Sequence, residues 1–347
     1  MRVLVTGGAG YIGGVVADRL LHDGHSVTVL DNLSKGRQQA VPSQAEFVLA
    51  DTGDAPALDR IFAAGGFDAV MHFAAFIEAG ESMVSPELYF DNNSAKTLTL
   101  LRAMLRHRVS RLVFSSTAAV YGDPRRLPIA EDDPLEPTNP YGESKLMVER
   151  MLAWFHTAHG LRYASLRYFN AAGATADRGE MHRPETHLIP LVLQAALGER
   201  EAISIYGTDY PTKDGTCIRD YIHIDDLATA HLLALDALAE SKTNAQSRTQ
   251  TQTHTHTQTR SKSAPLIFNL GSGSGFSVRE IVAVAGRVTG RKIPVVEAPR
   301  RPGDSAVLIA SSEKIKRELG WQPQHSDIEA IVRSAWEWHS SHTRSSR

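Results

Sequence analysis

The stretch VLVTGGAGYIG (residues 3–13) decides the fold that this sequence predicts. Its first four residues form an apolar run typical of a buried parallel strand, and three glycines follow at a spacing of three. Gly7 permits a tight turn out of the strand, Gly10 lets the backbone approach a pyrophosphate, and Gly13 lets the next helix pack against the strand. We expect that helix to begin at Tyr11, so that the first N–H groups, including those of Tyr11 and Ile12, face the phosphates of a dinucleotide.

Apolar runs and helical patterns alternate through the first half of the chain. We expect strands at Val3–Thr6, Ser26–Leu30, Phe47–Leu49, Ala69–Phe73, Arg111–Ser116 and Tyr163–Arg167. We expect helices at Tyr11–His22, Ala55–Ala64 (with Asp54 as its N-cap), Leu88–Arg108 and Tyr141–His159. Strands that alternate with helices predict an α/β fold with a doubly wound parallel (Rossmann) sheet.

The pattern loosens after about residue 170, which indicates a smaller C-terminal region that binds the substrate. We expect helices at His187–Leu197, Ile224–Leu238 and Val278–Val288, and strands at Ile203–Tyr206, Leu266–Asn269 and Ile293–Val296. The predicted division is a dinucleotide-binding domain over residues 1–170 and a mainly substrate-binding domain over residues 171–347. Some segments of the second part are expected to return to the first domain.

Residues 241–263 differ from the rest of the chain, because they are mostly Ser, Thr, Gln, His, Lys and Arg. Such a segment has too little apolar surface to offset the entropy lost on ordering, so it predicts a disordered surface insert. His254 and His256 lie in it and are expected to be solvated rather than to bind a metal ion. No metal site is expected elsewhere either.

The overall composition limits the possible functions. The chain has 347 residues with 37 Lys and Arg against 39 Asp and Glu, a net charge of −2 that argues against nucleic-acid binding. Its single cysteine, Cys217, excludes an intrachain disulfide and is typical of a reducing compartment. No apolar run approaches the roughly 20 residues of a membrane span, and the first strand leaves no room for a signal peptide. We therefore expect a cytoplasmic protein that does not bind membranes.

Asp31 closes the second predicted strand, 18 residues after Gly13. An acidic residue at this position hydrogen-bonds the adenosine ribose hydroxyls and repels a 2′-phosphate, which favours NAD over NADP. Lys35 and Arg37 lie close enough to weaken this preference, although a solvated basic loop is the simpler interpretation for them.

Tyr141 and Lys145 are four residues apart at the start of a predicted helix, so their side chains are expected on one side of it. A free tyrosine has a pKa of about 10, and a nearby ammonium favours its phenolate form. Thr117, with Ser115 and Ser116, ends the preceding strand at the edge where such sheets bind ligands. This combination indicates acid–base chemistry on a substrate hydroxyl, although Ser115 by itself is also a plausible strand-end cap.

With these residues, the chain resembles the extended short-chain dehydrogenase/reductase family and, within it, the UDP-sugar 4-epimerases. The resemblance covers nearly the whole chain apart from residues 241–263. It rests on these stretches: Thr6–Gly13, Asp31–Leu33, His72–Ala75, Gly80–Ser82, Asp91–Asn93, Phe114–Thr117, Val120–Gly122, Asn139–Lys145, Arg167–Asn170, Tyr206–Thr212, Asp214–Thr216, Arg219–His223, Asn269–Gly271 and Arg300–Asp304. The chain departs from the family's pattern at Ile77 and His187, where some members carry Lys and Asn, respectively.

The resemblance implies a role for many residues. Tyr141 would be the base, Lys145 would orient the nicotinamide ribose and lower the tyrosine pKa, and Thr117 would be the hydroxyl partner. The cofactor-binding residues implied by the glycine turn and the family are Gly7, Gly10, Tyr11, Ile12, Gly13, Asp31, Asn32, Asp51, Phe73, Ala74, Asn92, Ser115 and Tyr168. The substrate-binding residues implied are Asn170, His187, Leu188, Ser204, Tyr206, Arg219, Arg301 and Asp304.

The implied activity is the interconversion of UDP-glucose and UDP-galactose with a tightly bound NAD. Tyr141 would take the proton of the sugar 4-hydroxyl while a hydride passes to NAD, and the hydride would return to the opposite face of the 4-keto sugar. The two longest predicted helices, Leu88–Arg108 and Tyr141–His159, resemble those of the family's dimer interface. The resemblance therefore also implies a homodimer.

Three other functions are alternatives to a UDP-glucose 4-epimerase activity. A 4,6-dehydratase is disfavoured, because the family places acids directly after the threonine where Ala118 and Ala119 stand here. A 4-epimerase for UDP-N-acetylglucosamine or for UDP-xylose and UDP-arabinose stays open, since Leu308 lies where members differ in size. A non-catalytic NAD-sensing protein is disfavoured because Tyr141 and Lys145 are both present.

Overall fold

The computed structural model describes residues 1–182, 184–240 and 264–344. The predicted insert at residues 241–263, with His254 and His256, lies outside the described residues.

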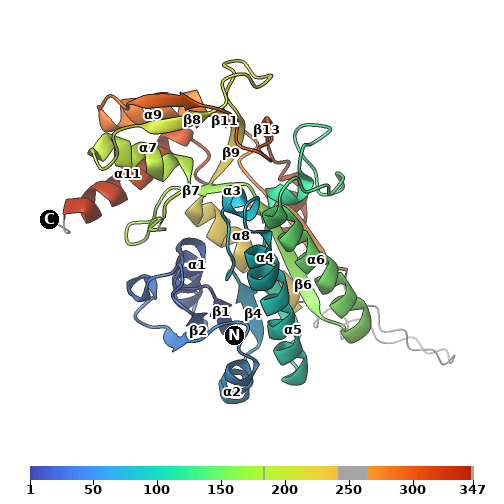
Figure 1. Cartoon of the computed structure of the whole chain (residues 1–347). Helices are drawn as coiled ribbons and strands as arrows, with labels where there is room; N and C mark the ends of the chain where they lie inside the picture. The colour runs from blue at the N-terminus through green and yellow to red at the C-terminus, as the bar shows by residue number, and fades with distance from the viewer. Residues whose placement is uncertain (183, 241–263, 345–347) are drawn as a thin grey trace.

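A central sheet of seven parallel strands organises the molecule, in the order β10-β6-β5-β4-β1-β2-β3 (Figure 1). Its strands are β1 (Arg2–Thr6), β2 (Ser26–Asp31), β3 (Glu46–Leu49), β4 (Ala69–His72), β5 (Arg111–Thr117), β6 (Arg162–Tyr168) and β10 (Leu266–Leu270). Thr6 pairs with Leu30 on one side and with His72 on the other, so the strand order reverses at β1. The predicted doubly wound parallel sheet is confirmed.

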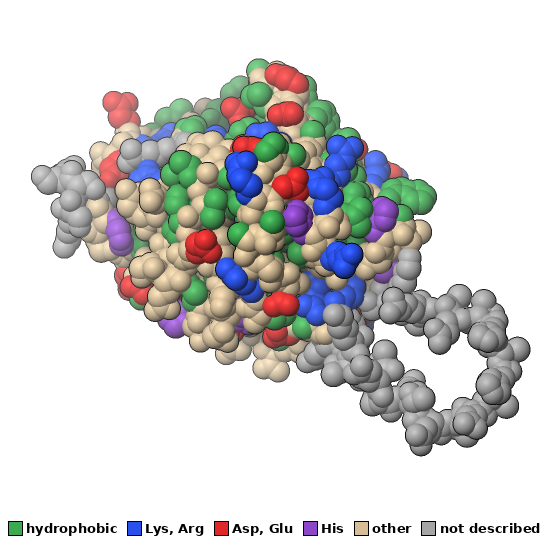
Figure 2. Space-filling model, turned by 90° about the horizontal axis from the view of Figure 1, so that it is seen from below, with side chains coloured by type: hydrophobic (Ala, Val, Ile, Leu, Met, Phe, Trp, Pro, Cys, Tyr) green, Lys and Arg blue, Asp and Glu red, His purple; other side chains and the backbone are tan. Residues whose placement is uncertain are grey.

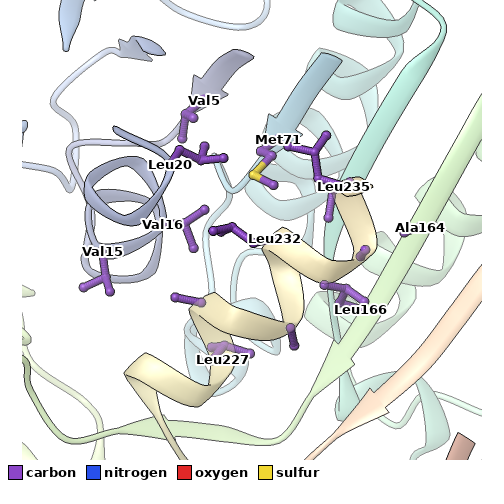
Figure 3. Packing of buried hydrophobic residues seen from close by; sticks show 14 of the residues in the cluster. Val5, Val15, Val16, Leu20, Met71, Ala164, Leu166, Leu227, Leu232 and Leu235 are labelled. Atoms are coloured by element: carbon purple, nitrogen blue, oxygen red, sulfur yellow. The ribbon is translucent and has the colours of Figure 1, made fainter. Parts of the chain in front are cut away.

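Helices cover both faces of this sheet. One face is covered by α1 (Tyr11–His22), α8 (Ile224–Glu240) and α10 (Glu313–Leu319), and the other by α2 (Ala55–Gly65), α5 (Lys96–Arg106) and α6 (Pro140–His159). Figure 3 shows the first face, where side chains of α1 and α8 meet those of the sheet: Val15, Val16, Leu20, Leu227, Leu232 and Leu235 against Val5, Met71, Ala164 and Leu166. Burying such apolar side chains stabilises the fold by roughly 1.5–3 kcal/mol each.

Local capping fixes the helices that carry the site. The predicted N-cap of α2 is confirmed, because the Asp54 carboxylate accepts the N–H of Ala57 at 3.0 Å. Asn139 caps α6 by accepting the N–H of Gly142 at 2.9 Å, and Pro140 occupies the first helical position. Tyr141 is therefore held in the first turn of α6.

The helix predicted at Leu88–Arg108 is present and runs to Arg106, but it contains a π-helical segment that was not predicted. The structure has α4 (Pro86–Tyr89), a π-helical turn at Phe90–Ala95, and then α5. The turn presents Asn93, whose side-chain oxygen accepts the N–H of Phe76 at 2.8 Å and whose amide donates to the carbonyl of Phe76 at 2.9 Å. A distant loop thus decides the irregularity, which local periodicity does not reveal.

A second region packs over the carboxyl ends of the central strands and appears at the top of Figure 1. It contains a sheet of β7 (Asn170–Ala172), β9 (Ile218–His223), β11 (Gly275–Ser277) and β13 (Val307–Leu308), the pair β8 (Ile203–Tyr206) and β12 (Val295–Ala298), and the helices α7 (Leu188–Leu197), α9 (Val278–Thr289) and α11 (Ile328–Arg344). A short helix α3 (Ala79–Ser82) and 3-10 turns at Gln38–Ala40 and Ala118–Tyr121 complete the described elements. The strand predicted at Ile293–Val296 begins two residues later than expected.

The strand predicted at Leu266–Asn269 forms part of β10, which lies in the central sheet. There β10 pairs with β6, with Phe268 beside Leu166. Helix α8 likewise packs on the central sheet rather than in the second region. The chain therefore returns to the first layer after crossing the second region, a long-range pairing that the pattern of one strand does not specify.

The surface carries no dominant charge on the face shown in Figure 2, where basic and acidic side chains are interspersed. This distribution agrees with the net charge of −2. Among the described residues, none of the helices is long and apolar enough to cross a membrane.

A buried histidine predicts how stability depends on pH. His231 of α8 is fully buried, and its Nδ1 donates to the carbonyl of Leu227, while its Nε2 has no partner among the described residues. Burial lowers the pKa of His231 to about 4. From pH 6.5 down to about 4 the unfolded chain therefore takes up a proton that the folded chain refuses, so stability falls as the pH falls.

Replacing His231 by leucine is expected to reduce this loss by about 1.4 kcal/mol per pH unit between pH 6 and 4.5. The measurement is urea unfolding of both proteins across this range. Equal slopes for the two proteins would show that the folded chain accepts the proton on His231.

Candidate active site

A cavity of about 330 Å³ lies at the carboxyl ends of the central strands, beside the reversal of strand order. Ligands of open α/β sheets bind in this position. All the predicted cofactor-binding residues line it, together with two of the three predicted catalytic residues: Gly7, Gly10, Tyr11, Ile12, Gly13, Asp31, Asn32, Asp51, Phe73, Ala74, Asn92, Ser115, Tyr168, Thr117 and Tyr141.

The glycine turn shows why side chains are excluded at two positions. Gly7 has φ +72°, and a Cβ there would lie 2.5 Å from the backbone nitrogen of Ala74. A Cβ at Gly13 would lie 2.3 Å from the carbonyl oxygen of Gly7. At Gly10, which lines the cavity, an added Cβ would lie 3.3 Å from the carbonyl oxygen of Gly7, a tight contact with the backbone. The bare backbone of the turn beside the N-terminus of α1 fits the pyrophosphate of a dinucleotide.

Asp31 joins the end of β2 to the glycine turn. Its carboxylate accepts the N–H of Ala9 at 3.0 Å and the N–H of Leu33 at 2.8 Å. Burial raises the pKa of Asp31, although both backbone donors act in the opposite direction. Each oxygen keeps a further lone pair that a ribose hydroxyl can use, so the residue is fixed in place for the predicted NAD contact.

Asp51 is the second carboxylate at this end of the cavity. It accepts the N–H of Gly53 at 2.7 Å, the side-chain amide of Asn32 at 2.7 Å and the ammonium of Lys96 at 3.0 Å. Burial raises the pKa of Asp51, but these donors outweigh it and hold the pKa below its usual value. Asn32 and Asp51 therefore act as one hydrogen-bonded unit at the predicted adenosine end.

Tyr141 and Thr117 meet at the opposite end of the cavity. The pKa of Tyr141 is raised to about 12, mainly by burial. The hydrogen bond with Thr117 lowers the pKa, and the Glu78 carboxylate contributes to the increase. The Thr117 hydroxyl also accepts the N–H of Ala119 at 3.1 Å. In the protein by itself, the phenol therefore keeps its proton at neutral pH.

Lys145 is buried one helical turn after Tyr141 on α6. It lies beneath the cavity, 2 % exposed, and its ammonium donates to the carbonyl of Ser115 at 2.9 Å. Burial lowers the pKa of Lys145 to about 7. The high pKa of Tyr141 in the chain alone follows first from the burial of its own phenol.

Three residues without a predicted role hold the backbone around Tyr141. Ser82 accepts the N–H of Tyr141 at 3.2 Å, and Ser144 donates to its carbonyl at 2.7 Å. Asn93 in turn donates to the Ser144 hydroxyl at 3.0 Å. Ser82 and Asn93 lie in stretches that carried the family resemblance, but only their tertiary contacts reveal what they do.

The residues predicted for the substrate fall into two groups. Asn170, His187 and Arg219 line the cavity, together with Leu308. Asp304 forms an ion pair with Arg219 at this wall. Burial lowers the pKa of His187, but Glu185 and Glu180 overcome this effect and raise it to about 9. His187 and Arg219 thus present two cations to a cavity that is otherwise lined by many apolar groups.

The remaining predicted substrate residues do not line this cavity. The guanidinium of Arg301 lies 3.8 Å from the ring centre of Tyr206, and Ser204 hydrogen-bonds the same tyrosine. The Arg301 hydrogen bond lowers the pKa of Tyr206. Leu188 begins α7 and packs against the core of the second region. Ser204, Tyr206 and Arg301 form a separate cluster on and next to β8.

Two more residues, Glu180 and His182, line the cavity without having been predicted. They lie in the loop before α7, a segment with neither strand nor helix periodicity. Glu78 was also missed, although it accepts a hydrogen bond from Lys35 at 2.8 Å at the edge of the cavity. Lys35 is therefore engaged in an ion pair rather than in the solvated loop that was the simpler expectation.

Together, the fold and the cavity define a dinucleotide-dependent enzyme, with Tyr141 in the lining of the cavity. The chain matches the model of the "NAD dependent epimerase/dehydratase family" over residues 3–246. It is 51% identical to a UDP-glucose 4-epimerase of Halalkalibacterium halodurans over 99% of this chain and 96% of that protein.

Solved structures agree with this match. A UDP-glucose 4-epimerase from Brucella ovis in complex with NAD superposes with a TM-score of 0.87 at 44% identity, covering 97% of each chain. A UDP-glucose 4-epimerase from Bifidobacterium longum in complex with NAD+ and UDP gives a TM-score of 0.89 at 36% identity, covering 99% of each chain. This chain belongs to the NAD-dependent epimerase/dehydratase family. The predicted family and the predicted cofactor class are confirmed.

Proposed function

We propose that this protein interconverts UDP-glucose and UDP-galactose by inverting the configuration at C4 of the sugar. The observation that carries the proposal is a single cavity lined by the glycine turn, by Tyr141 with Thr117, and by Asn170 with Arg219. A cofactor, an acid–base group and an anion-binding wall therefore share one space. Relatives named UDP-glucose 4-epimerase match nearly the whole chain.

NAD fits the part of this cavity that is lined by the glycine turn and the ends of β2 and β3. Gly10 presents its bare backbone to the cavity beside the N-terminus of α1, where the pyrophosphate would bind, while Asp31, Asn32 and Asp51 offer acceptors and donors to the adenosine. Bound NAD supplies a hydride acceptor that later returns the hydride to the same carbon. Asp31, which is fixed by two backbone N–H groups, disfavours the extra phosphate of NADP.

Tyr141 exchanges the proton of the sugar 4-hydroxyl through its phenol oxygen, and Thr117 hydrogen-bonds that oxygen. Because the phenol keeps its proton in the chain alone, the base form requires additional positive charge from the filled site. Lys145 is placed to contribute, since a nearby anion restores its charged form. The backbone bonds from Ser82 and Ser144 keep the phenol at its position through both proton transfers.

A nucleotide anchor lets the sugar turn over between the two transfers. Arg219, paired with Asp304, and the cationic His187 suit the diphosphate, because guanidinium and imidazolium groups form strong hydrogen bonds to phosphate oxygens. The Tyr206–Arg301 cluster on the outer side is proposed to contact the uridine. If the protein binds the UDP part tightly and contacts the sugar with few polar groups, the sugar ring can turn either of its faces toward the nicotinamide.

A 4,6-dehydratase needs an additional acid beside the threonine to eliminate water. Ala118 and Ala119 line the cavity at that position, and neither can transfer a proton. Epimerisation therefore remains the proposed reaction.

We further propose a cytoplasmic homodimer. Apolar side chains are exposed around α4 and along α6, among them Val84 (82%), Leu88 (45%) and Trp154 (73%). Such a patch on a monomer is typical of a surface that another chain covers. Analytical ultracentrifugation tests this, and a monomer at micromolar concentration would contradict it.

The reaction is tested by incubating the purified protein with UDP-galactose, UDP-N-acetylgalactosamine and UDP-arabinose, with chromatographic analysis of each product. UDP-glucose is the expected product of the first. Conversion of only one of the other two sugars would assign the protein to that UDP-sugar, and conversion of none would refute a 4-epimerase.

Replacing Arg219 by lysine is expected to raise the KM for UDP-galactose about tenfold to a hundredfold, with a smaller change in kcat. Lysine keeps the charge but lacks the planar fork that binds two phosphate oxygens and Asp304. Steady-state kinetics measures the effect. The matched control is Arg279→Lys, because Arg279 forms an exposed ion pair with Glu297 away from the cavity. Equal KM values for the two variants would show that Arg219 does not contribute to binding of the substrate.

A further inference from the structure

A cluster of two carboxylates and two imidazoles lies in the loop between β7 and α7. Glu180, His182 and His187 each offer one donor atom, and these three atoms all lie within 4.8 Å of one another. Their side chains are 7%, 18% and 36% exposed, so the cluster is largely withdrawn from water. This distinguishes it from the exposed acidic groups that are common on protein surfaces.

His182 makes an unusual approach to Glu180. Its Nδ1 lies 2.5 Å from a Glu180 carboxylate oxygen, so the two groups form a close ion pair. The two donor atoms therefore already face each other, as two ligands of one ion do.

The other members are oriented as metal ligands usually are. One oxygen of Glu180 accepts the N–H groups of Met181 and His182, at 3.0 and 3.1 Å, which fixes the carboxylate. His187 directs Nδ1 to Glu185 at 2.8 Å, and Glu185 also accepts the N–H of His187. A carboxylate on the second ring nitrogen is the usual partner of a metal-binding histidine.

We infer that Glu180, His182 and His187 form a binding site for one divalent transition-metal ion such as Zn²⁺. Two imidazoles and one carboxylate are a donor set that zinc prefers, and its ligand atoms lie about 3.3 Å apart in a tetrahedral site. The three donor atoms lie within 4.8 Å of one another, so only small side-chain movements bring them onto one ion. Binding displaces the protons of the imidazoles, so the bound ion replaces the positive charge that His187 offers to a diphosphate in the metal-free chain. The cavity beside the cluster leaves the fourth position open to water or another ligand.

The site would join the middle of one loop to its end. Glu180 and His182 lie near its middle, and His187 is the N-cap of α7. A bound ion would therefore fix the loop to α7 along the cavity wall and stabilise the folded chain by mass action.

The test is calorimetric titration of ZnSO₄ into the NAD-loaded protein after dialysis against EDTA. The background carries His254→Ala and His256→Ala, which removes the histidines of residues 241–263 from the titration. One saturable site is expected, and it is expected to disappear in Glu180→Gln and in His182→Gln. Glu185→Gln keeps all three ligands and is expected to weaken the affinity about 10- to 100-fold.

His325→Ala is the matched control, because His223, Asp225 and His325 form the other group of possible ligands in the described part of the chain. This variant is expected to keep the site. Cobalt titration adds a spectroscopic signature, since Co²⁺ in a tetrahedral histidine site absorbs visible light. Thermal melts identify any variant that fails to fold. If the Glu180 and His182 variants do not fold, the weakened zinc affinity expected for Glu185→Gln tests the proposal instead.

Either of two results would overturn the inference. One is that no site saturates in the parent protein. The other is that binding persists unchanged in the Glu180 and His182 variants, or is lost in His325→Ala alone.

Discussion

Replacing Tyr141 by phenylalanine is expected to lower kcat for UDP-galactose by about a hundredfold to ten-thousandfold while the protein keeps its NAD. The substitution removes one oxygen, which is the atom that exchanges the substrate proton, and general acid–base groups contribute about this much. The ring, which contacts Tyr89 edge-on with centres 6.4 Å apart, stays in place. The glycine turn and Asp31 lie at the other end of the cavity, so the proposed cofactor contacts are untouched.

The measurements are steady-state kinetics and the NAD content released on denaturation. Tyr163→Phe serves as the matched control, because Tyr163 is also a buried tyrosine on the neighbouring strand β6, but it faces the core beneath α6. It is expected to keep its activity. Near-normal turnover in Tyr141→Phe would assign the proton transfer to another group.

The second large effect is expected at Gly13, where alanine should destabilise the fold by about 1–3 kcal/mol or more and abolish NAD retention. The added Cβ would lie 2.3 Å from the carbonyl oxygen and 2.9 Å from the carbonyl carbon of Gly7. Both are backbone atoms of the turn, so no side chain can rotate away. Helix α1 must instead move outward, which displaces the N–H groups that face the phosphates.

Gly286 provides a control with the opposite expected sign. It also lies inside a helix, α9, but the nearest atom to an added Cβ is the carbonyl oxygen of Arg291 at 3.5 Å, an ordinary contact. Gly286→Ala is therefore expected to stabilise the protein by about 0.5–1 kcal/mol through the helix preference of alanine. Urea unfolding of both variants measures the contrast, and similar stabilities would show that α1 yields without cost.

Local signals in the sequence were sufficient for much of the nucleotide-binding half. The predicted helix at Tyr11–His22 and the Asp54 cap agree with the structure to the residue, because apolar period and capping chemistry act between near neighbours. The positions of Gly7, Gly13 and Asp31 followed from the same short stretch, where each constraint involves a strand, its turn and the next helix.

Contacts between distant segments were not predictable in this way. The π turn at Phe90–Ala95 forms because Asn93 bonds the backbone of Phe76, and β10 joins the central sheet about 100 residues after β6. The pKa of Tyr141 also depends on tertiary structure, because burial of its phenol raises it, while burial of the neighbouring Lys145 lowers the pKa of that ammonium. Helical spacing gives the side of a helix, but not the dielectric environment of the groups on it.

The sequence by itself determined the dinucleotide fold, the preference for NAD and the identity of Tyr141, Thr117 and Lys145 as candidate catalytic residues. Only the tertiary structure decided that Arg219 and His187 reach the same cavity while Arg301 and Tyr206 stand outside it, and that Glu180 and His182 join its wall. The reason is physical. A strand, a turn and a helix start are specified by neighbours in the chain, whereas a site wall is specified by which distant surfaces pack together and exclude water.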